Sequence, residues 1–347
     1  MAEVEGDAPI TAGIVAALPT AIDPLALSLN ESPLPPLAAV RSALVESIGA
    51  ANRYPEFFPQ QLRSLIAEHI GVADEQVVLG SGSTGVVLQV LHAVTRPGDR
   101  IVLTKPTFDG FPIMAEMARL RPVTVPLDEH GHHDLAAMAT AAAAAEVVVV
   151  CRPHNPTGTI ESAEDIERFL HRVPSETIVL LDEAYIEFVA PEHRLDSAAL
   201  VRRFPNVVVL RTFSKAYGLA GLRVGYGFGA PELGNKLWAM QVPFGMSITS
   251  AVAVAASYDA AAQLRQRVQR IVDERRILTR RLRATGLYTT DSHANFVYLP
   301  QGADRWPATF HGVLPQVRHY PDGGIRITVG GPESTRAVLG AIGAVPA

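Results

Sequence analysis

The sequence predicts an α/β protein, with a large domain built on a mostly parallel seven-stranded sheet and a smaller α+β domain after it. The main observation is a series of short, continuous apolar runs, rich in β-branched residues, between residues 50 and 245. Such runs are typical of strands buried on both faces, as in parallel sheets. Helical stretches separate most of them, as βαβ units require. The length of 347 residues favours two domains, at roughly 100–200 residues each.

The elements of the large domain follow from periodicity. Two helices, at 37–48 and 60–70, come first; the second places apolar residues at helical spacing. The predicted strands are 77–79, 101–104, 123–126, 147–151, 178–181, 207–212 and 222–227. The helices between them are predicted at 85–94, 111–119, 134–145 and 163–171.

The pattern changes after residue 247. A helical run begins there, a long Arg-rich helix is predicted at 263–284, short strands at 296–299 and 325–329, and a last helix at 333–342. We therefore expect residues 1–48 to form an N-terminal arm and part of the small domain. Residues 49–246 would form the large, cofactor-binding domain, and residues 247–347 the small C-terminal domain.

Composition narrows the class of protein. The net charge of −5 argues against a general nucleic-acid binder and against docking on anionic membranes. Cys151 is the single cysteine, so an intrachain disulfide is impossible and a reducing cytoplasm is the expected location. The acidic N-terminus differs from a secretory signal. Only three of the thirty cationic residues are lysines: Lys105, Lys215 and Lys236.

Small residues follow the first strand in the order Gly80-Ser81-Gly82-Ser83-Thr84-Gly85, before a helix. Such a turn lets backbone N–H groups approach a phosphate, and the helix N-terminus favours an anion. Taken alone, the turn fits an ordinary strand–helix connection equally well. It would also fit a nucleotide-binding oxidoreductase, although no partner acid can be identified downstream.

Chemically useful side chains follow three other strands. Asn155 lies in a Pro/Gly turn, Asp182 ends a buried strand with Tyr185 just after it, and Lys215 and Arg223 follow a third. Ligands in open α/β sheets bind at the carboxyl ends of the strands. A carboxylate there is costly unless a cation meets it, and a desolvated lysine can act as an amine. Together with the phosphate turn, these are the groups needed to hold pyridoxal phosphate.

Other polar residues receive structural interpretations. His130, His132 and His133 cluster in the segment DEHGHHD, where a solvated turn is favoured over a metal site. Cys151 is expected to be a packed small side chain at the end of a strand.

The motifs GSGSTG, HNPTGT, LLDEAYIEF, RTFSKAYGLAGLRVGY, ANFVYL and IRITVG occur in this order. Over nearly the whole chain the sequence resembles the fold-type-I pyridoxal-phosphate-dependent aminotransferases. Within these it is most similar to the histidinol-phosphate aminotransferases and their aromatic (phenylalanine) branch. The resemblance implies a cytoplasmic homodimer with shared active sites, which uses pyridoxal 5'-phosphate, no metal, a small-molecule amino donor and an oxo acceptor.

The resemblance also implies residue roles. Lys215 would bind the cofactor covalently and move the substrate proton, Asp182 would pair with the pyridine nitrogen, and Tyr185 would act with Asn155 on the ring oxygen. Arg326 would take the substrate carboxylate, and Arg318 would lie near the distal end of the substrate, with Asn155 also near it. The remaining cofactor contacts would be Ser83, Thr84, Phe108, Thr212, Ser214, Arg223 and, from the neighbouring subunit, Tyr54.

The substrate is less well defined. Relatives that act on histidinol phosphate often carry LNENPYGP near the N-terminus, whereas this chain has Leu34 in place of the tyrosine. Leu34, Phe57 and Phe58 would suit a flat ring, so we favour transfer from glutamate to an aromatic oxo acid. The alternatives are histidinol-phosphate aminotransfer, a secondary-metabolism aminotransferase or lyase on the same scaffold, a nucleotide-binding oxidoreductase, and a non-catalytic protein that has kept the fold.

Overall fold

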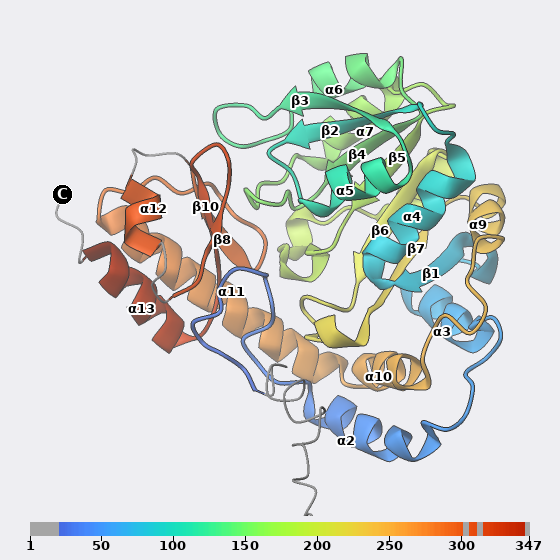
Figure 1. The fold of residues 1–347 in the computed structure, drawn as a ribbon, viewed down its shortest axis with the longest axis horizontal. Helices are drawn as coiled ribbons and strands as arrows, with labels where there is room; N and C mark the ends of the chain where they lie inside the picture. Colours follow the sequence, from blue (N-terminus) through green and yellow to red (C-terminus); the bar gives the residue numbers. More distant parts are fainter. Residues whose placement is uncertain (1–20, 301–304, 311–314, 344–347) are drawn as a thin grey trace, which may run out of the picture.

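A computed structural model describes residues 21–300, 305–310 and 315–343. Its main element is a seven-stranded sheet in the order β1-β7-β6-β5-β4-β2-β3 (Figure 1). The strands are β1 (Val77–Ser81), β2 (Arg100–Lys105), β3 (Arg121–Pro126), β4 (Val147–Cys151), β5 (Ile178–Asp182), β6 (Val207–Thr212) and β7 (Val224–Phe228). Only β7 runs antiparallel to its neighbours, which confirms the predicted sheet.

Helices cover both faces of this sheet. Alternate strand residues point into two separate apolar cores: Val147 and Val149 into one, Val148 and Val150 into the other. The first core packs against α4 (Gly82–Val94), α5 (Gly110–Met117) and α9 (Pro231–Trp238). The second packs against α3 (Gln60–Ile70), α6 (Leu135–Ala142), α7 (Ala163–Arg172) and α8 (Ser197–Arg203). Burial on both sides explains why the strands are continuously apolar.

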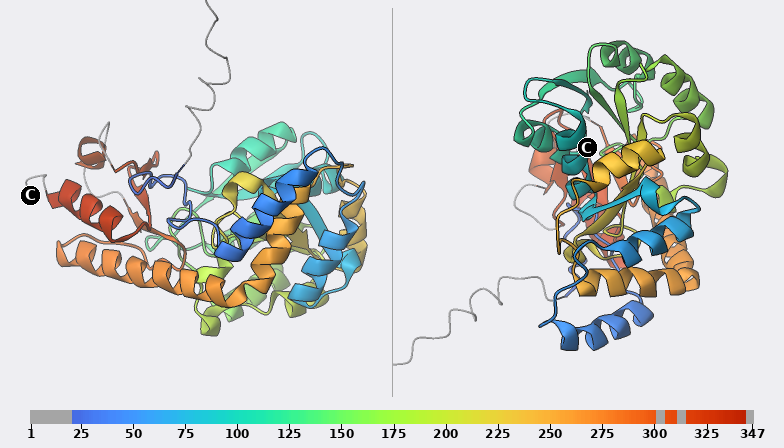
Figure 2. Two further views of the ribbon diagram at one scale, coloured as in Figure 1. Left: turned by 90° about the horizontal axis from the view of Figure 1, so that it is seen from below. Right: turned by 90° about the vertical axis from the view of Figure 1, so that its right-hand side faces the viewer.

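The C-terminal part holds a second, antiparallel sheet in the order β8-β10-β9. Its strands are β8 (Phe296–Leu299), β9 (Arg318–His319) and β10 (Ile325–Thr328). The remaining helices are α2 (Ala38–Ser47), α10 (Ile248–Asp259), α11 (Ala261–Ala284), α12 (Arg305–Phe310) and α13 (Pro332–Gly343). Figure 2 shows α2 lying alongside α10, with the long α11 extending away beneath the second sheet.

The N-terminal segment links the two parts. Leu27 N–H donates to the Gln316 carbonyl, and Thr328 N–H donates to the Leu27 carbonyl. Residues 28–31 then pass over the carboxyl end of the large sheet, where Lys215 Nζ donates to the Leu29 carbonyl at 3.0 Å. The first twenty residues of the predicted arm lie outside the described residues.

Most predicted elements are confirmed, with shifted ends. The helix predicted from residue 85 already begins at Gly82, because the glycine turn itself forms its first turn. The strand predicted from residue 222 begins at Val224, because residues Ala220–Leu222 form a 3-10 turn before it. Helices α8, α9 and α12 and the two-residue β9 were not predicted. None of the described helices combines the length and apolarity needed to cross a membrane.

Candidate active site

A cavity of about 420 Å³ opens at the carboxyl ends of the parallel strands, between the large sheet and the second one. It brings together the predicted cofactor-binding and polar substrate-binding side chains, but not Tyr54 or the expected apolar ring contacts Leu34, Phe57 and Phe58. Those lining it are Ser83, Thr84, Phe108, Asn155, Asp182, Tyr185, Thr212, Ser214, Lys215, Arg223, Arg318 and Arg326. The topology explains this convergence, because β4, β5 and β6 are adjacent and parallel and end at the same edge.

One end of the cavity is suited to an anion. The first turn of α4 leaves the N–H groups of Ser83 and Thr84 without intrahelical partners. The hydroxyls of Thr212 and Ser214 lie 3.0 Å apart beside it. Arg223 Nη2 lies 3.4 Å from the Ser81 carbonyl. Donors, a helix N-terminus and a guanidinium therefore meet at one point, as phosphate binding requires.

Gly82 makes this arrangement possible. Its φ of 72° lies in the left-handed region that favours glycine. A side chain at this position would collide with the Arg223 guanidinium. Glycine at this position therefore serves two purposes. It leaves room for the Arg223 guanidinium, and it lets the backbone come close to a bound phosphate.

The opposite charges of the site lie on β5 and just after β6. Asp182 accepts a hydrogen bond from Ala184 N–H at 3.0 Å, and among the described residues no cation forms an ion pair with it. Burial raises the pKa of Asp182 to about 6. Burial and the nearby Arg326 lower the pKa of Lys215 to about 8. The cation that the sequence predicts beside Asp182 is thus not supplied by the described chain, and a protonated ligand nitrogen would take its place.

Asn155 and Tyr185 form the next part of the wall. Asn155 Nδ2 donates to the Tyr185 hydroxyl at 3.3 Å. Asn30 Nδ2 donates to the same hydroxyl at 2.9 Å, a contact that sequence reasoning missed. Asn30 has a φ of 56°, a conformation that asparagine tolerates better than most residues. Burial raises the pKa of Tyr185, so its hydroxyl keeps its proton and can donate to an oxygen of a bound ligand.

Two arginines from the second sheet complete the cavity, in different states. Arg326 is buried and donates to the Ser28 carbonyl at 2.7 Å and to Asn155 Oδ1. Its Nε has no hydrogen-bond partner, and no carboxylate of the described chain pairs with it. Arg318 is half-exposed, and its Nη2 lies 2.7 Å from Asp109 Oδ2. Arg326 therefore has no carboxylate partner and can take an anion, whereas Arg318 already has one in Asp109.

Phe108 supplies an aromatic face. Its ring packs edge-on against Phe111, with the ring centroids 5.5 Å apart. A Cβ atom at Gly110 would collide with the Phe108 ring. Glycine at this position therefore leaves room for the ring to line the cavity.

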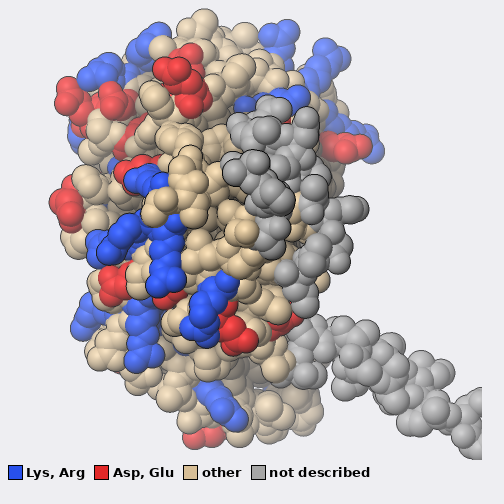
Figure 3. Space-filling model, turned by 90° about the vertical axis from the view of Figure 1, so that its left-hand side faces the viewer, with Lys and Arg blue, Asp and Glu red and all other residues tan. Residues whose placement is uncertain are grey.

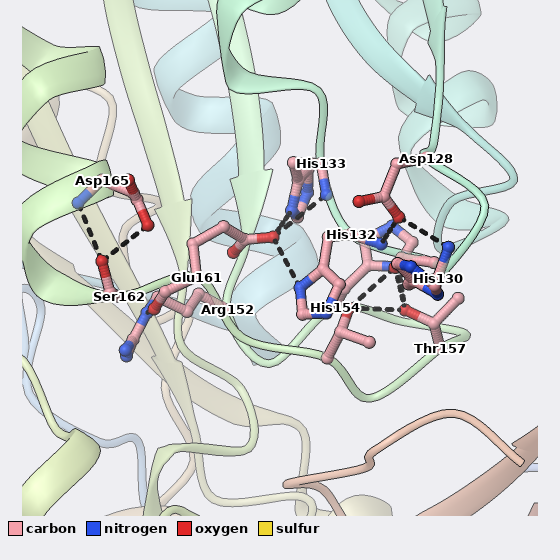
Figure 4. Close-up of polar contacts among 12 residues, drawn as sticks. Asp128, His130, His132, His133, Arg152, His154, Thr157, Glu161, Ser162 and Asp165 are labelled. Atoms are coloured by element: carbon pink, nitrogen blue, oxygen red, sulfur yellow. Dashed lines mark hydrogen bonds and ion pairs between the residues drawn. The ribbon is translucent and has the colours of Figure 1, made fainter.

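A buried polar network supports the turn that carries Asn155 (Figure 4). Glu161 Oε1 accepts from His133 Nδ1 at 2.8 Å and from His133 N–H at 3.0 Å. The His133 ring packs edge-on against His154, with 4.7 Å between centroids. Arg152 Nε donates to the Glu161 carbonyl at 2.9 Å. Burial alone would raise the pKa of Glu161, but the charge and hydrogen bonds of His133 outweigh it and hold that pKa at about 2.

This network corrects one interpretation. The solvated turn predicted for the three histidines is right for the exposed His130 and wrong for His133, whose side chain is fully buried. The sequence could not reveal that Glu161, from the segment after the Asn155 turn, lies over it. Among the described residues no group of three or more His, Cys, Asp or Glu side chains is arranged to hold a metal ion. Cys151 is buried, as predicted.

Tyr54, Phe57 and Phe58 lie outside this cavity. Tyr54 is 81% exposed and packs against Phe244 with ring centroids 4.9 Å apart. Phe57 also packs against Phe244, at 4.9 Å. Leu34 lines a neighbouring cavity, next to Ser214 and Gly218. Within one chain, none of the aromatic residues expected near a flat ring reaches the site except Phe108.

Comparison with known proteins supplies a family. The family model for aminotransferase class I and II matches residues 22–339. The aromatic amino acid aminotransferase of Rhodococcus opacus is 41% identical over 318 residues, which cover 90% of this chain and 88% of that protein. The aromatic amino acid aminotransferase of Mycobacterium tuberculosis is 38% identical over 337 residues, covering 95% of this chain and 96% of that protein.

Solved structures agree. A histidinol-phosphate aminotransferase from Sinorhizobium meliloti, crystallised in complex with pyridoxal-5'-phosphate, superposes with a TM-score of 0.84 at 26% identity and covers 97% of each chain. An aspartate aminotransferase from Thermus thermophilus superposes with a TM-score of 0.80 at 19% identity, covering 99% of this chain and 100% of that one. The second likeness shows the fold alone.

Proposed function

The chain belongs to the class I and II aminotransferase family, and from that premise we propose that it transfers the amino group of glutamate to an aromatic oxo acid. The acceptor class comes from the relatives named aromatic amino acid aminotransferase. The observation that supports the choice within this chain is the Asp109–Arg318 ion pair in the cavity wall. Membership of the family removes the nucleotide-binding oxidoreductase from consideration.

The cofactor of this family is pyridoxal 5'-phosphate, and the cavity fits it. The donors at the α4 N-terminus, with Thr212, Ser214 and Arg223, would hold the phosphate. Asp182, an unpaired carboxylate, suits a protonated ring nitrogen. Asn155 and Tyr185 would donate to the ring oxygen, and the face of Phe108 would contact the ring. When bound, the cofactor supplies an electron sink for the substrate Cα.

Lys215 and Asp182 would control the protons of the reaction. A pKa of about 8 leaves the Lys215 amine partly neutral near physiological pH. Such an amine can accept a proton from the substrate Cα and return it, which is the property that general acid–base catalysis needs. The Asp182 carboxylate would hold the proton on the ring nitrogen, where negative charge develops during the reaction.

The two ends of the substrate meet different arginines. The buried Arg326, whose Nε is unpaired, would take the carboxylate common to donor and acceptor through its planar fork. Arg318 would face the distal end of the substrate, but its Nη2 already donates to Asp109 Oδ2 at 2.7 Å. A phosphate ester there would have to displace Asp109 and would meet its negative charge. An uncharged aromatic ring faces neither cost, so the pair favours an aromatic acceptor over imidazole-acetol phosphate.

This specificity predicts an outcome for kinetic comparison. With glutamate as donor, we expect a higher kcat/KM for phenylpyruvate than for imidazole-acetol phosphate. Asp109→Asn should narrow the difference by roughly tenfold, because it frees Arg318 and removes a repulsive charge; charged hydrogen bonds contribute about 1.5–3 kcal/mol. Arg318→Ala is the control, since it should not improve the phosphate ester.

A preference of wild-type protein for the phosphate ester by more than tenfold, abolished in Arg318→Ala, would reverse this assignment. The enzyme would then be a histidinol-phosphate aminotransferase. Inactivity with both acceptors, while other oxo acids react, would point to the secondary-metabolism alternative. Loss of carbon dioxide from amino acids in place of transfer would indicate a lyase.

We also propose a homodimer in which Tyr54 reaches the partner's cofactor phosphate. Large exposed apolar patches on a protein mark interaction sites, and Tyr54 lies in one. Its other exposed members are Phe57, Phe58 and Phe244, whose rings pack against one another and against Tyr54. In such a dimer, Phe57 and Phe58 would also come near the partner's site. We further propose that the large domain begins at residue 49 and the small C-terminal domain at residue 247. We also propose that the protein is cytoplasmic.

Tyr54→Phe tests the shared site. The ring should still pack against Phe244 while the hydroxyl is lost, so folding should change little. Loss of a hydrogen bond to phosphate should weaken cofactor retention by roughly 10- to 150-fold. Sedimentation velocity at micromolar concentration should give a dimer, and dialysis should release cofactor faster from the variant. A fully active monomer, or unchanged retention in Tyr54→Phe, would contradict the shared site.

A further inference from the structure

A second polar cavity lies apart from the active site, against the C-terminal half of α11. Its volume is about 580 Å³. One wall consists of Arg275, Arg276, Arg280 and Arg283. Arg276, Arg280 and Arg283 share one face of the helix because they are three to four residues apart, and the largely buried Arg275 lies next to Arg276. Figure 3 shows basic side chains gathered in a band on the side of the molecule where α11 ends.

These arginines are poorly compensated. Among the described residues, no carboxylate pairs with Arg275, Arg280 or Arg283, while Arg276 has only an exposed contact with Asp273 at 3.3 Å. Arg275 is 9% exposed and donates to the Ala294 carbonyl. Its pKa is lowered to about 10 by burial and by Arg276. Arg276 repels Arg275, Arg283 donates to Thr289, and Asp291 is the lining carboxylate whose charge acts on Arg275 and Arg283. A multivalent anion would compensate the positive charge that Asp291 leaves over.

The opposite wall adds two histidines and two acids. His193 and His293 pack edge-on with ring centroids 5.6 Å apart. Asp291 lies 3.7 Å from His293, so it is partly compensated. Glu192 is exposed at the rim. Four guanidinium groups against two carboxylates leave the lining net positive. Because the chain as a whole carries −5, a small anion fits this cavity better than a nucleic acid.

Two hydrogen bonds, each accepted by a backbone carbonyl, connect this cavity to the active site. Arg152 Nη2 donates to the His193 carbonyl at 2.8 Å, and His293 N–H donates to the Gly158 carbonyl at 2.7 Å. Both contacts fix the turn that carries Asn155. A ligand that moves either histidine therefore acts on the ends of that turn.

We propose that the α11 cavity binds a small polyanion of the phosphate class and that its occupancy is transmitted through the 152–158 turn to Asn155. Coupling between two sites typically changes the binding affinity at one of them by about 5- to 150-fold, and here the change would be measured as kcat/KM. We expect an effect near the lower end, because the contacts pass through backbone groups of a well-packed turn.

The test uses the cofactor-loaded protein and pyrophosphate as the probe. Titration calorimetry should detect one site per chain, and Arg276→Gln/Arg280→Gln should weaken it by at least about tenfold, as expected for loss of two charged contacts. The matched control is Arg265→Gln/Arg270→Gln, which removes the same charge from exposed positions on α11. Binding should persist in an Arg318→Ala background, which separates this cavity from the substrate site.

Kinetics then test the coupling. Saturating pyrophosphate should change kcat/KM about fivefold in wild type and in the control variant, but not in Arg276→Gln/Arg280→Gln. Absence of binding, or equal loss in both double variants, would refute the site. Binding without a kinetic effect would refute the coupling. Calorimetry measures binding without turnover. It therefore tests the pyrophosphate site independently of which acceptor the enzyme uses.

Discussion

Lys215→Ala is expected to abolish turnover, with a loss of at least about 10³-fold in kcat, because general acid–base catalysis alone contributes about 10²–10⁴-fold. The variant should still bind pyridoxal phosphate weakly through Arg223 and the α4 N-terminus. In wild type, borohydride reduction followed by peptide mass spectrometry should place the cofactor on Lys215. Lys236→Ala, at an exposed position, is the matched control and should keep full activity. A reduced adduct on Lys105 or Lys236 would overturn the assignment.

The same lysine offers a readout that does not require turnover. In cofactor-free protein, limiting acetic anhydride should label Lys215 with a pH midpoint near 8, since burial and Arg326 lower its pKa to about that value. Only the neutral amine reacts, so labelling should rise about tenfold per pH unit below the midpoint and level off above it. Arg326→Gln should move the midpoint upwards. A wild-type midpoint at or above 10 would show that Lys215 is not desolvated.

Much of the fold could be predicted because the strands are buried on both faces. The runs at Val147–Cys151 and Val207–Thr212 are apolar from end to end, so the sequence locates them closely. Helix α8 is only seven residues long, too short for a clear period. The start of α4 was misplaced because Gly82 and Ser83 have low helix propensity. Contacts with Arg223 and β7 stabilise that first turn, and local sequence does not report them.

The site was predictable where one motif carries one side chain, and less so where two distant segments meet. Lys215, Asp182 and Asn155 each follow a recognisable strand. By contrast, Asp109 and Arg318 are separated by 209 positions, and nothing local to either residue indicates the pair. Asn30 is similar, since its contact with Tyr185 spans 155 positions. The pairing of Asp109 with Arg318 bears on substrate specificity and joins distant segments. The cofactor contacts come from contiguous motifs, which the sequence shows directly.

Asp182→Asn should lower kcat by at least about 10²-fold, the scale of one preorganised electrostatic contact. The substitution keeps the shape of the side chain and the Ala184 contact but removes the charge. An amide cannot hold a proton on the ring nitrogen, so charge developing there would lose its stabilisation. The folded protein should not suffer, because the raised pKa of about 6 shows that burial disfavours the carboxylate. Removing that charge should therefore leave the cofactor-free protein at least as stable near pH 8, by thermal unfolding.

The sign of this stability effect follows from linkage. A carboxyl group whose pKa is raised on folding destabilises the native state above that pKa, and the penalty disappears as pH falls below the unfolded value. Asp182→Asn and wild type should therefore differ at pH 8 and converge near pH 4, while their turnover differs at pH 8. Asp259→Asn, at the exposed end of α10, is the control for loss of one carboxylate far from the site. Near-normal aminotransfer by Asp182→Asn would show that this carboxylate does not drive the chemistry.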